Sequence, residues 1–123
     1  MLIDTQIFIW WMEKSPRLSP KIISILKDRN EPIFFSLVSV WEIVIKKGVK
    51  KLKTPYDVEG GILASGFNLL PIELAHILEV EHLPSIHKDP FDRLLIAQAI
   101  VEKIKIITAD PVFSKYPVAL FKG

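Results

Sequence analysis

Acidic residues are the side chains of this sequence best suited to chemistry. Five of them stand where the hydrophobic pattern changes: Asp4, Glu42, Asp89, Asp92 and Asp110. Carboxylates brought close together repel one another and raise one another's pKa values unless a cation neutralises them. The sequence has no cysteine, so thiolate sites and disulfides are excluded, and Mg²⁺ or Mn²⁺ is the expected partner of clustered acids. Phosphoryl chemistry assisted by one or two such ions is the usual purpose of this kind of site.

Each acid also has a purely structural explanation. Asp and Glu near the start of a helix accept hydrogen bonds from free amides and complement the helix dipole. Asp89 before a proline looks like such a cap, with Asp92 at the spacing of its partner, and Glu42 follows Ser39 at the same spacing. Capping does not explain why so many acids should share one region with few basic neighbours. We therefore favour metal binding.

The elements that must position these acids alternate between strands and helices. Short β-rich runs predict strands at residues 1–3, 32–38, 68–72 and 104–108, with an edge strand at 118–121. Apolar stripes, caps and prolines predict helices at 7–12, 20–30, from 39 onward, 54–66 with a weak point at Gly60 and Gly61, 74–83 and 91–102, and a short turn after Asp110. Because parallel strands need crossovers, this order predicts an α/β protein: a three-layer α/β/α sandwich around a central parallel sheet.

This architecture predicts that the acids meet. The carboxyl ends of parallel strands and the amino ends of the helices lie along the same edge of the sheet. Asp4 ends the first strand, Glu42 falls in the first turn after the second, Asp89 and Asp92 open the helix before the fourth, and Asp110 follows the fourth. We expect the residues from these four segments to share one cleft.

Length, composition and charge place further bounds on the protein. The 123 residues are 50% hydrophobic, enough for a core in a single domain spanning residues 1–123. The net charge is only +2, but a lysine cluster is a candidate phosphate-binding patch or a merely solvated face: Lys46, Lys47, Lys50, Lys51 and Lys53. With no basic leader and no apolar run of about 20 residues, we expect a cytoplasmic protein that does not enter the membrane.

Three further groups of residues have competing interpretations. The spacing of His76, His82 and His87 does not suit a zinc site, and we assign none of them as a ligand. His87, Lys88 and Arg93 lie beside the acids and are candidates for phosphate contact, although a solvated position or a salt bridge to Asp89 is equally plausible. Trp10, Trp11 and Trp41 lie in apolar stretches, where packing in the core or against a partner is favoured over stacking on RNA bases.

Several segments together resemble a known family. They are Met-Leu-Ile-Asp4-Thr-Gln, Ser39-Val-Trp-Glu42-Ile, His87-Lys-Asp-Pro-Phe-Asp92-Arg93 followed by Leu-Leu-Ile-Ala-Gln-Ala, and Thr108-Ala-Asp110. In this order they are similar to the PIN domain, specifically to VapC-type toxins of type II toxin–antitoxin pairs. The resemblance implies strand order 3-2-1-4-5, with Asp4 and Asp110 flanking the switch between strands one and four. Gln6 departs from the His often found at its position, which puts a supporting role there in doubt.

The resemblance also implies a mechanism and partners. Asp4, Glu42, Asp92 and Asp110 would be the catalytic quartet of an endoribonuclease that uses one or two Mg²⁺ or Mn²⁺ ions to activate water. Asp4, Asp92 and Asp110 would hold metal, and Glu42 would be either a ligand or a base. Asp89, Arg93, Thr108, Lys46 and Lys47 are candidate substrate or supporting residues. The family implies RNA as substrate, an antitoxin protein as inhibitor and a homodimer.

Two other functional classes are open at this point. One is a catalytically silent PIN-like module that only binds RNA or a partner protein, against which the intact acidic quartet speaks. The other is a phosphatase or receiver-like domain that uses Asp4 as nucleophile or phosphoacceptor. A phosphatase of that kind is expected to carry an acid two residues later, where this chain has Gln6.

Overall fold

A four-stranded parallel sheet forms the centre of the molecule. In the computed structural model, which describes residues 1–28, 30–48 and 57–121, the strands are β1 (Leu2–Ile3), β2 (Phe34–Ser36), β3 (Asn68–Leu70) and β4 (Ile106–Ile107), in the order β3-β2-β1-β4. Leu2 pairs with Phe34 on one side and with Ile106 on the other. The predicted edge strand is reduced to one parallel bridge, between Leu120 and Ile106. The α/β fold class and the predicted strand order are confirmed.

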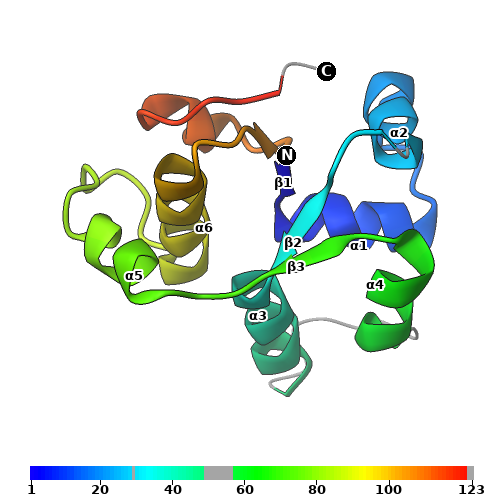
Figure 1. Ribbon diagram of the computed structural model, residues 1–123, viewed down its shortest axis with the longest axis horizontal. Helices are drawn as coiled ribbons and strands as arrows, with labels where there is room; N and C mark the ends of the chain where they lie inside the picture. Colours follow the sequence, from blue (N-terminus) through cyan, green and yellow to red (C-terminus); the bar gives the residue numbers. More distant parts are fainter. Residues whose placement is uncertain (29, 49–56, 122–123) are drawn as a thin grey trace.

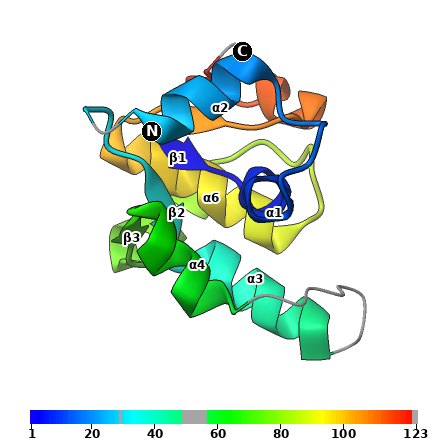
Figure 2. The same ribbon diagram turned by 90° about the vertical axis from the view of Figure 1, so that its right-hand side faces the viewer.

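Helices cover both faces of the sheet. They are α1 (Thr5–Glu13), α2 (Pro20–Lys27), α3 (Leu37–Gly48), α4 (Val58–Ser65), α5 (Leu74–Val80) and α6 (Pro90–Glu102), followed by the 3-10 helix η1 (Pro111–Lys115). Figure 1 shows α5 and α6 on one side of the strands and α1, α2 and α4 on the other. Figure 2, turned by 90°, shows α3 and α4 together at one end of the molecule. This is the predicted three-layer arrangement.

The alternation of side chains along the strands divides the core in two. Ile3, Phe35 and Ile107 face α1 and α2, where the rings of Phe8 and Phe35 stack with centroids 4.1 Å apart. Leu2 and Ile106 face the opposite layer. That second core is filled mainly by α6, whose Leu95, Ile96, Ala97 and Ala99 are buried. The helix α6 is covered on two sides, by the sheet and by the neighbouring helices α3 and α5.

The start of α3 differs from the prediction. This helix begins at Leu37, directly after β2, and Ser36 Oγ accepts a hydrogen bond from the backbone N–H of Val38 at 2.9 Å. Ser39 is therefore inside the helix and buried, and Glu42 is its sixth residue. The interpretation of Ser39 and Glu42 as a capping box, with Glu42 in the first turn, is wrong because Ser36 takes the place of the cap.

The glycine pair in α4 does not interrupt the helix. A side-chain carbon added at Gly61 would lie 2.6 Å from Met12 Cε of α1. The missing side chain thus allows α4 and α1 to approach closely, and this packing outweighs the weak helix propensity of glycine. The predicted helix start at Thr54 and Pro55 lies outside the described residues. Among the helices in the described ranges, none is long and apolar enough to span a membrane.

Candidate active site

Asp4 lies where β1 ends beside β4. Its backbone N–H donates to Ile107 O at 3.1 Å, and its side chain caps α1 by accepting from the Ile7 N–H at 2.8 Å. The Thr108 hydroxyl donates to the other carboxylate oxygen, Oδ2, at 2.5 Å. Burial raises the pKa of Asp4 to about 7, against the lowering effect of these two hydrogen bonds, and the charges of Asp92 and Asp110 raise it further. Asp4 is thus a buried acid at the centre of a negative cluster.

Asp89 and Asp92 enter the site from the start of α6. Asp89 caps this helix, accepting from the backbone N–H groups of Phe91 at 2.8 Å and Asp92 at 3.4 Å. Asp92 is in the first turn. Burial raises the pKa of Asp92 to about 6, the charge of Asp89 adds to the rise, and a hydrogen bond with His87 opposes it. Asp89 is therefore both a cap, as its sequence indicated, and a charge beside the cluster.

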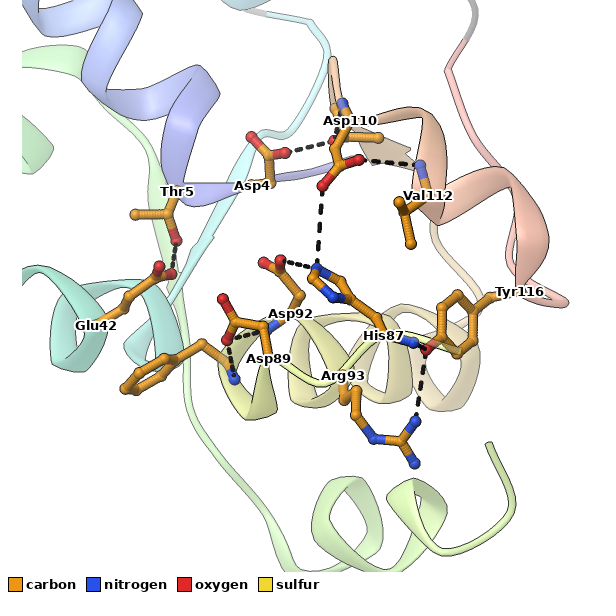
Figure 3. A network of polar contacts seen from close by, with 12 residues as sticks. Asp4, Thr5, Glu42, His87, Asp89, Asp92, Arg93, Asp110, Val112 and Tyr116 are labelled. Carbon is orange, nitrogen blue, oxygen red and sulfur yellow. Dashed lines mark hydrogen bonds and ion pairs between the residues drawn. The ribbon is translucent and has the colours of Figure 1, made fainter. Parts of the chain in front are cut away.

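Asp110 enters the site from the segment after β4 and lies across His87 from Asp92. It follows β4, caps η1 through the Val112 N–H at 2.9 Å, and donates its own N–H to Thr108 Oγ1 at 3.0 Å. His87 Nε2 lies between the two acids, 2.7 Å from Asp92 Oδ2 and 4.0 Å from Asp110 Oδ2. Figure 3 shows this imidazole bridging the carboxylates. The sequence places His87 beside the acids as a candidate for phosphate contact, but does not predict its position between Asp92 and Asp110.

Glu42 completes the cluster from α3. Its carboxylate accepts from Thr5 Oγ1 at 2.6 Å and forms an ion pair with Lys46, one helical turn later. Thr5 Oγ1 also lies 2.8 Å from the buried Ser39 Oγ. Glu42 is only 4% exposed, so the ammonium of Lys46 and the hydroxyl of Thr5 compensate a charge that is nearly out of reach of bulk water.

A cleft of about 450 Å³ contains all the predicted acids. Its lining includes Asp4, Glu42, Asp89, Asp92 and Asp110, and also Lys46. Four chain segments that are distant in sequence therefore converge at the carboxyl edge of the sheet, as the alternation of strands and helices predicts. The exposed Gln6 lines the same cleft.

Arg93 occupies a different setting from the one expected. Its guanidinium donates to Pro84 O at 2.8 Å and Val80 O at 3.3 Å, and it lies 3.5 Å from the hydroxyl of Tyr116. In Figure 3 it extends away from the acids. This geometry speaks against the expected contact of Arg93 with substrate, because its donors bind Val80 at the end of α5 and Pro84 in the loop before α6. Its position one residue after Asp92 puts it on another side of the helix.

The lysine cluster is only partly described. Lys46 reaches into the cleft, whereas Lys47 is exposed in the last turn of α3. Lys50, Lys51 and Lys53 lie outside the described residues. Of the candidate supporting residues, Thr108 and Lys46 therefore touch the acids directly. Thr5 and His87 also touch the acids. From the sequence, Thr5 was named only as the neighbour of Asp4, and His87 was not assigned as a metal ligand.

The three histidines lie in separate surroundings, which agrees with the rejection of a zinc site built from them. His82 is exposed. His76 is fully buried, and its Nδ1 accepts from the backbone N–H of Glu73 at 3.0 Å. Nε2 therefore carries the hydrogen, which it donates to Glu102 at 2.9 Å. With its lone pair and its hydrogen both in use, His76 joins α5 to α6 rather than binding an ion.

Comparison with known proteins decides the family. The family model described as PIN domain matches residues 1–119. The chain belongs to the PIN domain family. No curated protein matches it in sequence, but chains of solved structures resemble it in fold over nearly their whole length.

Three of these structures illustrate the likeness. VapBC2 from Rickettsia felis, bound to a promoter DNA fragment, has a chain 19% identical to this PIN domain, with a TM-score of 0.73 and coverage of 98% of this chain and 96% of that one. A toxin–antitoxin complex from Klebsiella pneumoniae is 20% identical, with a TM-score of 0.67 and coverage of 98% and 95%. FitAcB from Neisseria gonorrhoeae is 21% identical, with a TM-score of 0.67 and coverage of 98% and 96%.

Proposed function

We propose that this PIN domain is the toxin of a VapC-type toxin–antitoxin pair, an endoribonuclease dependent on Mg²⁺ or Mn²⁺. One observation carries the proposal: Asp4, Glu42, Asp92 and Asp110 converge in a single cleft, and the pKa values of Asp4 and Asp92 are raised there. Acids held together at such a cost mark a functional site. The resemblance in fold to chains from toxin–antitoxin complexes supports the toxin assignment.

The donor set fits a hard divalent cation. Asp4, Asp92 and Asp110 present carboxylate oxygens, the ligand type that Mg²⁺ and Mn²⁺ prefer. These three acids would hold one or two ions. In this proposal Glu42 is not a ligand but the base described below. When bound, the cation supplies a Lewis acid for the scissile phosphate and lowers the pKa of a water molecule.

The residues of the chain divide the remaining work. Thr108 fixes the rotamer of Asp4, and Asp89 holds the start of α6 so that Asp92 faces the cleft. Glu42, anchored by Thr5 and balanced by Lys46, is placed to accept the proton of the attacking water. As the water oxygen bonds to phosphorus, the bond to the leaving ribose oxygen breaks, that oxygen takes up a proton from solvent, and Lys46 offers a positive charge to the phosphate.

Two apolar regions, one a groove lined by half-buried side chains and one an exposed stripe, support the expected partners. An apolar groove of about 540 Å³ beside α1 and α2 is lined by Trp11, Met12, Leu18 and Ile23. We propose that an apolar helix of the antitoxin lies along this groove, near Trp10 and Trp11, and directs a basic side chain toward the acids. A complex in which the partner touches neither this groove nor the acids would contradict this binding mode.

The second apolar region lies on α3 and α5. On α3, Trp41, Val44 and Ile45 are exposed at helical spacing, as are Leu74 and Ile77 on α5. Stripes of this kind are typical of interfaces between copies of a chain, and we propose that they form a homodimer. The proposal places the protein in the cytoplasm, where RNA and the antitoxin are found.

A cleavage assay tests the nuclease assignment. Total RNA is incubated with the wild type and Mn²⁺, with the wild type and EDTA, or with the Glu42→Gln variant and Mn²⁺. The RNA ends of each reaction are then sequenced. We expect defined cleavage sites only for the wild type with Mn²⁺. RNA binding without cleavage by the intact protein would instead favour the catalytically silent PIN-like module. Sequencing of RNA ends after brief induction in cells then identifies the target.

A further inference from the structure

Two hydrogen bonds anchor the backbone of the segment that carries His87. The backbone N–H of His87 donates to the hydroxyl of Tyr116 at 2.6 Å, and Tyr116 is itself 4% exposed in the core. Arg93 binds the same segment through Pro84 O at 2.8 Å. The backbone that carries the imidazole is thus positioned by contacts that do not involve the ring. Its contacts among the described residues run through Nε2 to Asp92 and Asp110.

The spacing of these three groups is that of ligands around one ion. In octahedral coordination with bonds of about 2.1 Å, adjacent ligands lie about 3.0 Å apart and opposite ligands about 4.2 Å apart. His87 Nε2 lies 2.7 Å from Asp92 Oδ2 and 4.0 Å from Asp110 Oδ2. One ligand atom from each of the three residues falls within 4.8 Å of the others. Small adjustments of the side chains would therefore close this set around a cation.

His76 provides the internal contrast. It too has two carboxylates nearby, from Glu73 and Glu102. Its Nδ1, however, accepts a backbone N–H, so Nε2 keeps its hydrogen and cannot coordinate an ion without breaking the start of α5. No such backbone donor occupies the ring of His87 among the described residues. Of the two clusters, only the one at His87 can offer a nitrogen lone pair.

We propose that His87 Nε2 is a metal ligand, alongside Asp92 and Asp110, in the nuclease site. This inference rests on the proposed function and adds a ligand to it. Imidazole nitrogen favours transition-metal ions over Mg²⁺. The site is therefore selective for Mn²⁺ or Co²⁺ over Mg²⁺, in contrast with a site made only of carboxylates. The expected rejection of all three histidines as ligands is revised for His87 alone.

Pulsed electron paramagnetic resonance of bound Mn²⁺ gives a readout independent of activity. Nitrogen coordinated directly to Mn²⁺ produces a ¹⁴N modulation of the electron spin echo. We expect this modulation in the wild-type protein and in the control variant His82→Ala, whose imidazole is exposed and outside the cleft. We expect its loss in His87→Ala. That variant keeps the backbone contact to Tyr116, and thermal melting checks that it folds.

Calorimetric titration with Mn²⁺ and Mg²⁺ tests the selectivity. Loss of an outer partner of a metal ligand weakens affinity about 10- to 100-fold, so loss of a ligand should cost at least about tenfold for Mn²⁺. The loss for Mg²⁺ should be smaller. Two results would overturn the role of His87 while leaving the nuclease proposal intact. One is Mn²⁺ binding by the wild type without ¹⁴N modulation, and the other is an Mn²⁺ affinity of His87→Ala that equals or exceeds that of the wild type. Failure of the wild type to bind Mn²⁺ at all would overturn both.

Discussion

The hydroxyl of Thr108 donates a hydrogen bond to Asp4 Oδ2 at 2.5 Å, across the junction of β4 and β1. The hydroxyl oxygen of Thr108 also accepts a hydrogen bond from the backbone N–H of Asp110 at 3.0 Å. One small side chain therefore fixes the positions of two acids of the cleft. It also opposes the effect of burial on Asp4, because a donor stabilises the ionised carboxylate and lowers its pKa.

Replacement of Thr108 by valine tests this role. Thr108→Val removes the donor at nearly constant volume, so the pKa of Asp4 should rise by about one unit, given the strength of a hydrogen bond to a charged group. We expect the pH profiles of Mn²⁺ binding and RNA cleavage to move to higher pH. Thr108→Ser keeps the hydroxyl and should behave like the wild type. Identical profiles for the valine variant and the wild type would contradict the role.

The raised pKa values of Asp4 and Asp92 predict how the stability of the metal-free protein depends on pH. The folded-state pKa values, about 7 and about 6, lie above the ordinary value of 3.8. Between about pH 4 and pH 7 the folded state therefore binds more protons than the unfolded state, and its stability falls as the pH rises through this window. Asp4 and Asp92 should therefore make the free energy of unfolding larger at pH 5 than at pH 8, as measured by urea unfolding in EDTA.

The variant Asp4→Asn isolates one contribution to this dependence. It keeps an oxygen that can cap α1 and removes the charge. Its stability advantage over the wild type should be less than half of its maximum at pH 5 and grow toward pH 8, up to a limit of about 4 kcal/mol set by a shift of about three pKa units. A difference that does not vary with pH would show that the Asp4 carboxylate is not strained by burial.

Arg93 is expected to contribute to stability rather than to RNA binding. Arg93→Ala removes donors to Pro84 O and Val80 O, and we expect the free energy of unfolding to fall by about 1–3 kcal/mol. Arg93→Lys should rescue little, because an ammonium cannot reproduce the fork of a guanidinium. Urea unfolding measures the change. Weakened RNA affinity at unchanged stability would restore the original assignment of Arg93 to the substrate.

The lysines of α3 are matched for a test of phosphate attraction. Lys46 lines the cleft, whereas Lys47 is exposed beside it. If both contribute to a basic patch, Lys46→Gln and Lys47→Gln should each weaken RNA binding and reduce the slope of log affinity against log salt by about 0.7. If only the cleft matters, Lys46→Gln alone has the effect. If the double variant keeps both affinity and slope, the cluster is a solvated face.

The sequence predicted the arrangement of the sheet and the meeting of the acids, because both depend on patterns local to each element. Asp4, Asp92 and Asp110 follow or precede elements whose direction is set by parallel topology. Glu42 reaches the cleft for another reason. The helix begins two residues earlier than its apparent capping box, and the hydroxyl of Thr5, far away in sequence, donates a hydrogen bond to the Glu42 carboxylate.

Other features could not be predicted from the sequence, because tertiary contacts decide between local alternatives. The continuity of α4 through Gly61 depends on Met12 of another helix. Arg93 follows Asp92 in sequence, but the carbonyls of Pro84 and Val80 draw its side chain away from the cleft. The position of His87 depends on Tyr116, which is 29 residues later. No periodicity or motif of the sequence reports these contacts.

Metal binding should reverse the stability cost of the clustered acids. Mn²⁺ or Mg²⁺ that binds the folded site, and hardly the unfolded chain, should stabilise the wild type by about 2.7 kcal/mol at one hundred times the dissociation constant. Asp4→Asn and Asp110→Asn should keep or raise the stability of the metal-free protein, while losing most of the metal-dependent increase and the cleavage of RNA. Both acids also cap helical turns, and asparagine caps about as well as aspartate.

Capping alone therefore predicts a different pattern for the same two variants. If Asp4 and Asp110 were only caps, metal would change little in any of the proteins, and the asparagine variants would match the wild type in stability and activity. Melting curves of the three proteins with Mn²⁺ and with EDTA separate the two cases. A wild type whose melting temperature does not rise with Mn²⁺ would rule out the metal site. A rise in the wild type that persists in both variants would place the ion on other residues.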